Sequence, residues 1–292
     1  MTPEKWAIRI SHIVSAAMGD DRFPIDVSEV AREISHHLYP DDPISVIKGA
    51  PLSSFDGALA RAPVEKQGWG IFYNDDIESQ GRINFTLGHE FGHYLLHRLE
   101  HLDGFNCTSR DLVRLDNVLN EIEHQANVFA SYLLMPLDDF RRQIPPLVAP
   151  TFDDLSACAN RYGVSLTAAA LKWIKYTERR AILVMSRDGF VLWAWSSDSA
   201  YRSGAFIKTA DRPPIPVPTT SLAADPVSNR FESTAREHGE GVWLQQESCD
   251  ELALFSDRYD FAMSLLHLPS KSPAVDLHES DVRLRELDSP SW

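Results

Sequence analysis

Two histidines and a glutamate within five residues, His89-Glu90-Phe91-Gly92-His93, carry the clearest chemical signal in the chain. Histidines at positions i and i+4 lie on one face of a helix and can bind one metal ion together. A divalent ion held in this way lowers the pKa of its bound water towards about 7, and Glu90 can accept the proton as a general base. The spacing therefore predicts hydrolysis of a peptide bond.

Apolar residues around this motif predict that it lies on a buried helix from about Gly81 to Leu99. They occupy more than one face of that helix, so its histidine rings need polar partners. Upstream, residues 69–73 have the pattern of a short strand that ends at the turn Asn74-Asp75-Asp76. This strand either packs under the helix as a core strand or is an edge strand that pairs with an extended substrate.

The motif supplies two metal ligands, whereas a catalytic zinc site needs three protein ligands and an open position for water. One known arrangement has a third His six residues after the second, preceded by a Gly, but Leu96 and Leu99 occupy these positions. His97 continues the row of histidines but lies about 6 Å further along the helix from His93. We expect His97 to support a ligand or to face the surface, so the third ligand must come from another segment.

A second helix is predicted over residues 121–136, about 30 residues downstream, with an apolar face and a proline at its end. Glu123 is the first candidate for the third ligand. Asn127 lies four residues later on the same face, where its amide can steady the carboxylate of Glu123. Glu121 points about 160° away around the helix, and it remains an alternative ligand together with His124.

The two motifs together resemble those of the ImmA/IrrE metallopeptidases, which are bacterial and phage-related enzymes. The resemblance rests on residues 85–97 (FTLGHEFGHYLLH), 123–130 (EHQANVFA) and 133–136 (LLMP), and it spans roughly residues 5 to 140. Gln125 departs from the pattern, because a second Glu often stands at this position. Since Gln125 is not the proposed ligand, the departure puts little of the predicted site in doubt.

The resemblance implies a zincin-like fold in which His89, His93 and Glu123 bind the metal and Glu90 is the catalyst. Zinc is the expected ion and manganese the other candidate. Family members cleave helix-turn-helix repressors and so relieve transcriptional repression, which implies a zinc-dependent endopeptidase with such a repressor as its protein partner. The alternative is a regulatory or antitoxin-like protein that binds its partner on a peptidase scaffold without cutting it.

Residues 144–179 predict a helix-turn-helix-like segment. We expect Asp153 to cap the first helix, Gly163 to end it, and Ser165 to cap the second. The second helix has a largely apolar front at Ala168-Ala169-Ala170-Leu171, which favours packing or repressor docking over base reading. Direct DNA binding is the less favoured alternative.

The rest of the chain, residues 180–292, predicts a smaller β-rich domain with a sensory or docking role. Residues 181–186 and 190–195 flank Asp188-Gly189, which is a strong signal for a β-hairpin. Further strand-like runs lie at 241–244 and 261–266, and we expect the segment from Ser270 to be irregular. The predicted fold class is α+β. It comprises a zincin-like metallopeptidase domain over 1–143, the helix-turn-helix-like segment over 144–179, and the smaller β-rich domain over 180–292.

Composition and cysteine usage predict a cytoplasmic protein. The hydrophobic and charged fractions, 43% and 24%, are those of an ordinary globular protein. Cys107, Cys158 and Cys249 are widely spaced and form no CxxC pair, so neither a disulfide framework nor a structural zinc knot is indicated. Residues 6–14 predict an amphipathic helix, and we expect no signal peptide and no contact with a membrane.

The net charge of −14 argues against broad affinity for nucleic acids, because the phosphate backbone repels the chain as a whole. Acidic residues gather towards the end, where residues 231–292 contain 13 Asp and Glu against 5 Lys and Arg. This excess either solubilises the surface or favours a basic partner such as a DNA-binding repressor.

Overall fold

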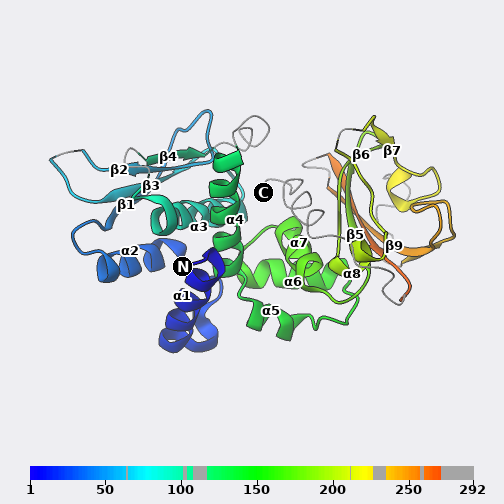
Figure 1. The fold of residues 1–292 in the computed structure, drawn as a ribbon, viewed down its shortest axis with the longest axis horizontal. Coiled ribbons are helices and arrows are strands. Elements are labelled where there is room, and N and C mark those ends of the chain that lie inside the picture. The colour runs from blue at the N-terminus through cyan, green and yellow to red at the C-terminus, as the bar shows by residue number, and fades with distance from the viewer. Residues whose placement is uncertain are drawn as a thin grey trace. The chain divides into compact units, whose positions relative to one another are not determined.

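The structure is a computed structural model that describes residues 1–63, 65–100, 104–107, 117–210, 212–225, 235–256 and 260–270 (Figure 1). Over 104–107 and 117–120 it describes the course of the backbone. The described residues form two compact units, the first comprising 1–140 and 157–168 and the second comprising 141–156 and the described residues from 169 to 270. The domain boundaries expected at residues 143 and 179 stay a prediction.

The first unit begins with two helices joined by a short 3-10 turn: α1 (Pro3–Met18), η1 (Gly19–Arg22) and α2 (Val27–Leu38). α1 is the amphipathic helix predicted at this end, with Ala7, Ile10 and Val14 on its buried face. Thr2 and Asp26 cap α1 and α2, since their side-chain oxygens accept hydrogen bonds from backbone N–H groups of the first turns.

The first unit also holds a four-stranded sheet with the order β1-β3-β2-β4. Its strands are β1 (Ile44–Ala50), β2 (Gly57–Arg61), β3 (Trp69–Asn74) and β4 (Gly104–Cys107). The predicted strand is confirmed as β3, which pairs with β1 in parallel and with β2 in antiparallel orientation. The suggestion that it is an edge strand for substrate is wrong, because both sides of β3 are already hydrogen-bonded to neighbours; β1 and β4 are the outer strands.

Helix α3 (Gln80–His97) carries the motif and lies across one face of this sheet (Figure 1). Ser79 caps it, because its side-chain oxygen accepts a hydrogen bond from the N–H of Arg82. The second predicted helix is α4 (Asn117–Leu134), and it is followed by α5 (Leu137–Gln143). α4 ends just before Pro136, as expected from the loss of a backbone donor at proline.

Two glycines of α3 allow it to approach α4 closely. A Cβ atom at Gly92 would lie 3.2 Å from the Cα of Ala126 and 3.0 Å from Cδ1 of Phe129, and one at Gly88 would lie 3.3 Å from the Cβ of Ala130. Real Cβ atoms rarely have such short contacts. The small residues therefore set the spacing of the two helices, which must together bring the predicted ligands to one point.

The helix-turn-helix-like pair is observed as α6 (Phe152–Tyr162) and α7 (Leu166–Tyr176). Gly163 ends α6 with a φ of 60°, and the Ser165 hydroxyl accepts a hydrogen bond from the N–H of Ala168 at 3.1 Å, as predicted. The prediction for Asp153 is wrong. Thr151 caps α6 instead, because Thr151 and Asp154 each accept a hydrogen bond from the other's N–H, at 3.3 and 2.8 Å.

The second unit contains a six-stranded antiparallel sheet with the order β7-β6-β5-β10-β9-β8. The predicted hairpin is confirmed as β5 (Ala181–Arg187) and β6 (Phe190–Ser196), whose turn residues Asp188 and Gly189 both have positive φ. The remaining elements are α8 (Asp198–Arg202), β7 (Ile215–Pro216), η3 (Leu222–Ala224), β8 (Arg236–His238), β9 (Cys249–Ser256) and β10 (Phe261–His267).

Of the two further strands predicted in this unit, the one at 261–266 is confirmed as β10, and the one at 241–244 is wrong. There the chain turns, since Gly241 has a φ of 86° and its N–H donates to the carbonyl of Leu244 at 2.8 Å. The expectation of irregular structure beyond Ser270 falls on residues outside the described part of the chain. With a helix-rich part and a β-rich C-terminal part, the fold class is α+β as predicted.

Within the part of the chain that the structure describes, no helix combines the length and the apolar character needed to cross a bilayer.

Candidate metal centre

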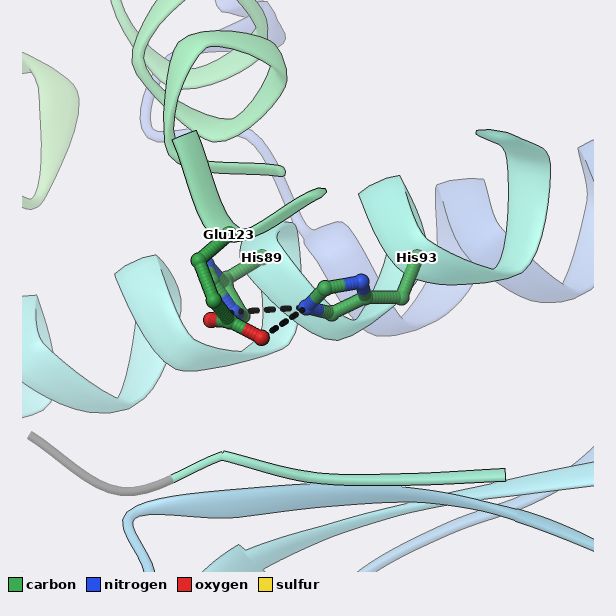
Figure 2. Close-up of side chains that lie close together, drawn as sticks. All are labelled: His89, His93 and Glu123. Carbon is green, nitrogen blue, oxygen red and sulfur yellow. Dashed lines mark hydrogen bonds and ion pairs between the residues drawn. The ribbon is translucent and has the colours of Figure 1, made fainter. Parts of the chain in front are cut away.

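The structure brings His89 and His93 of α3 together with Glu123 of α4, and their side chains point toward one another (Figure 2). The two Nε2 atoms lie 2.9 Å apart. Glu123 spans them, with Oε2 3.1 Å from Nε2 of His89 and Oε1 3.3 Å from Nε2 of His93. In the part of the chain that is described, these three residues form the one group of His, Cys, Asp or Glu side chains close enough to hold a metal ion.

The spacing of these atoms fits a tetrahedral metal. Zinc binds histidine nitrogen and carboxylate oxygen at about 2.0–2.2 Å, so that two ligand atoms on one tetrahedral ion are separated by about 3.3 Å. The observed separations of 2.9, 3.1 and 3.3 Å differ from this value by a few tenths of an ångström. Three protein ligands leave one tetrahedral position for water or substrate, which is the donor set of a hydrolytic rather than a structural zinc site.

Asn127 lies one helical turn after Glu123 and contacts the site from outside. We expected its amide to steady Glu123, but its Oδ1 lies 2.9 Å from Nδ1 of His89. An amide oxygen only accepts hydrogen bonds, so Nδ1 of His89 carries a proton and Nε2 is the nitrogen that faces Glu123. Asn127 therefore orients a predicted ligand, though the ligand is His89.

The other candidate residues of the two helices occupy different positions. His97 is buried, and its Nδ1 lies 3.1 Å from Nδ1 of His93. Glu121, an alternative for the third ligand, accepts a hydrogen bond from Gln125 at 2.8 Å, away from the cluster. His124, the other alternative, is half-buried and is not a member of the cluster.

Residues 44–173 match the family model Peptidase_M78, which is described as the IrrE N-terminal-like domain. This part of the chain belongs to the ImmA/IrrE family. No curated protein matches the chain. The match confirms the resemblance inferred from the two motifs. It begins at residue 44, later than the expected residue 5, and it extends beyond residue 140 through α6 and most of α7. Membership indicates a metallopeptidase-type function, and the cluster of His89, His93 and Glu123 is a possible metal site in this family domain.

Glu90, the predicted catalyst of this peptidase domain, is fully buried between α3 and the sheet. It lies against Gly57 of β2, where an added Cβ atom would be 2.8 Å from Oε1 of Glu90 and 2.4 Å from Cγ2 of Thr86. Only a residue without a side chain leaves the carboxylate in its present position. Nothing in the sequence around Gly57 indicates this role, because the contact joins segments more than 30 residues apart.

Burial and charge act in opposite directions on the ionisable groups of the metal-free cluster. Burial disfavours the charged form of His89, but hydrogen bonding and the negative charges of Glu123 and Glu90 outweigh it and raise the pKa of His89. Burial, together with the charge of His89, lowers the pKa of His93 to about 4. Burial would raise the pKa of Glu123, but its contacts with the two histidines hold this pKa well below its ordinary value.

The structure gives Tyr94 a packing role. Its ring is fully buried and makes an edge-to-face contact with Trp69, and its hydroxyl donates to the backbone carbonyl of Asp42 at 2.7 Å. The hydroxyl is therefore committed to the core of the domain.

Proposed function

We propose that the protein is a zinc-dependent endopeptidase that hydrolyses one peptide bond in a specific protein substrate. The observation that carries this proposal is the convergence of two Nε2 atoms and a carboxylate at separations close to those on a tetrahedral ion. The family match supports it independently, since it rests on sequence over residues 44–173 rather than on these distances.

The chemistry follows from the residues around this point. A zinc ion bound by His89, His93 and Glu123 would polarise the scissile carbonyl and acidify water. Glu90 lies next to His89 on the same helix, so its carboxylate can take a proton from the attacking water and pass it to the leaving amine. Because Glu90 is buried, its carboxylate works in surroundings of low dielectric, where its electrostatic interactions are stronger than in water.

Strand β4 is the best placed element to hold the substrate backbone. It pairs with β2 on one side, and among the described strands it forms an outer edge of the sheet. Its residue Cys107 is in register with Gly57, which contacts Glu90. An extended peptide that adds to this outer edge of the described sheet would be aligned along the strands with the level of Glu90, so strand addition is proposed for β4 in place of β3.

The substrate is proposed to be a helix-turn-helix repressor, and cleavage is proposed to relieve repression in the cytoplasm. This part rests on the family resemblance. Helix α7 fits a packing or docking role, because residues 168–174 are all buried and leave few side chains for base reading.

The mechanism is tested with Glu90→Gln, which keeps the size of the side chain and removes its basicity. We expect the variant to bind zinc with unchanged affinity and to lose cleavage by at least about a hundredfold. Glu100→Gln, the same change at an exposed position just beyond α3, serves as the control. Full activity in Glu90→Gln would exclude the proposed mechanism.

The substrate is found by comparing new protein N-termini in cells that express wild type or Glu90→Gln, before and after DNA damage. A small set of cuts that depends on Glu90, especially inside a repressor, supports a selective protease. If both folded, zinc-loaded proteins give the same N-termini, the chain is a binding scaffold under these conditions, as in the alternative regulatory hypothesis.

A further inference from the structure

A chain of hydrogen bonds leads from the surface of α4 to the proposed metal ligand His93. Glu121 accepts from the side-chain amide of Gln125 at 2.8 Å. Oε1 of Gln125 lies 3.1 Å from Nε2 of His97, and Nδ1 of His97 lies 3.1 Å from Nδ1 of His93. The chain crosses from α4 to α3 through the contact between Gln125 and His97. It uses one pair of residues with i, i+4 spacing on each helix.

Glu121, at the outer end, sets the direction in which these hydrogen bonds run. An ionised carboxylate only accepts hydrogen bonds, so Glu121 requires the NH₂ group of Gln125 to face it. The amide oxygen of Gln125 must then face His97, whose Nε2 carries a proton and donates it to that oxygen. A neutral imidazole has one N–H, so Nδ1 of His97 is the acceptor for the proton on Nδ1 of His93.

This order of hydrogen bonds leaves Nε2 of His93 available to a metal ion. With its proton on Nδ1, His93 presents the lone pair of Nε2 to the cluster, as a metal ligand must. Asn127 fixes His89 in the same tautomer from the other side. When His89 is neutral, two lone pairs face each other at 2.9 Å beside the carboxylate of Glu123, an arrangement that favours a cation between them.

We propose that Glu121 and Gln125 are positioning residues that set the tautomer of His93 through His97 and thereby tune the affinity for the metal. The inference rests on the proposed function, because it concerns the same metal site. Glutamine suits this place because it accepts from His97 and donates to Glu121 at once. A glutamate at this position could accept from His97 but could not donate to Glu121.

The test measures zinc affinity by competition with a chelator and the position of the His93 proton by long-range ¹H–¹⁵N spectra of the metal-free protein. Gln125→Leu removes the acceptor for His97, and we expect the Kd for zinc to rise about tenfold with a mixture of His93 tautomers. Gln125→Glu restores that acceptor, and its Kd should stay within about threefold of wild type. His124→Leu, the same kind of change one residue away on α4, should leave both readouts unchanged.

Glu121→Gln provides a second variant at an exposed position where the fold is not at risk. A glutamine there can donate or accept, so the hydrogen bonds no longer have one fixed direction. The His93 spectrum should then show both tautomers. Wild-type affinity in Gln125→Leu, or an equal loss in Gln125→Leu and Gln125→Glu, would overturn the proposal. If wild type itself does not bind zinc, the proposed function fails, while the tautomer spectra of the metal-free variants still decide whether the chain orients His93.

Discussion

Replacing Gly92 by Ala should weaken zinc binding by forcing helices α3 and α4 apart. The new Cβ atom would lie 3.2 Å from the Cα and 3.3 Å from the carbonyl oxygen of Ala126. These are backbone atoms, which cannot rotate out of the way, so α4 itself must move. Ala126 is three residues after Glu123, and a shift of the helix at this point carries the third ligand with it.

The size of the effect follows from these distances. Comfortable carbon contacts lie at about 3.5–4.0 Å, so relief needs a shift of about half an ångström. Metal ligands tolerate deviations of about 0.2 Å. We expect the Kd for zinc to rise about tenfold, which corresponds to about 1.4 kcal/mol. The metal-free protein should lose between nothing and about 2 kcal/mol of unfolding free energy, because overpacking is partly offset by the better helix propensity of Ala.

Chelator competition measures the Kd, and thermal unfolding with and without zinc measures the stability. Gly239→Ala is the control, since the same change there places a Cβ atom that meets nothing within 4 Å. It should change the Kd by less than about threefold. An unchanged Kd in a folded Gly92→Ala protein would refute the reasoning that this spacing sets the site.

Two further predictions concern the catalyst and the dependence on pH. Gly57→Ala should push the carboxylate of Glu90 out of place and reduce kcat by about 10- to 100-fold with little change in zinc affinity; equal kcat values for the two proteins would contradict the contact. Zinc affinity should fall as the pH falls from 7 to about 5, by about tenfold per pH unit once His89 is protonated. His93, with a pKa of about 4, stays neutral in this range, so titrations of the Kd should show the uptake of one proton, and a slope of two would contradict this assignment.

The sequence determined those features that depend on neighbours along the chain. Helical geometry alone places His89 and His93 on one face, because residues four apart are separated by about one turn. The Asp188-Gly189 pair predicts its hairpin for the same kind of reason, since both residues accept positive φ and the flanking strands must then pair. Such signals need no knowledge of the remaining fold.

The prediction of an edge strand failed because its outcome depends on distant segments, and the prediction of a strand at 241–244 failed because the backbone turns locally. The pattern of residues 69–73 identifies a strand, but its two partners, β1 and β2, are chosen by the whole sheet, so its central position was not visible. At 241–244 the apolar residues have the composition of a strand, yet the backbone bends at Gly241 and closes a turn. Local propensity is a weak guide where tertiary packing competes with it.

The features of the metal site also fall into two groups, those identified from the sequence and those that depend on the tertiary structure. The sequence by itself supplied the two histidines, Glu90 and a ranking that placed Glu123 first, because each follows from spacing on one helix. Only the tertiary structure brought Glu123 to the histidines, directed Asn127 to His89 and linked Gln125 to His97. The physical reason is that these contacts join two helices, and their distances depend on how closely the backbones pack at Gly92.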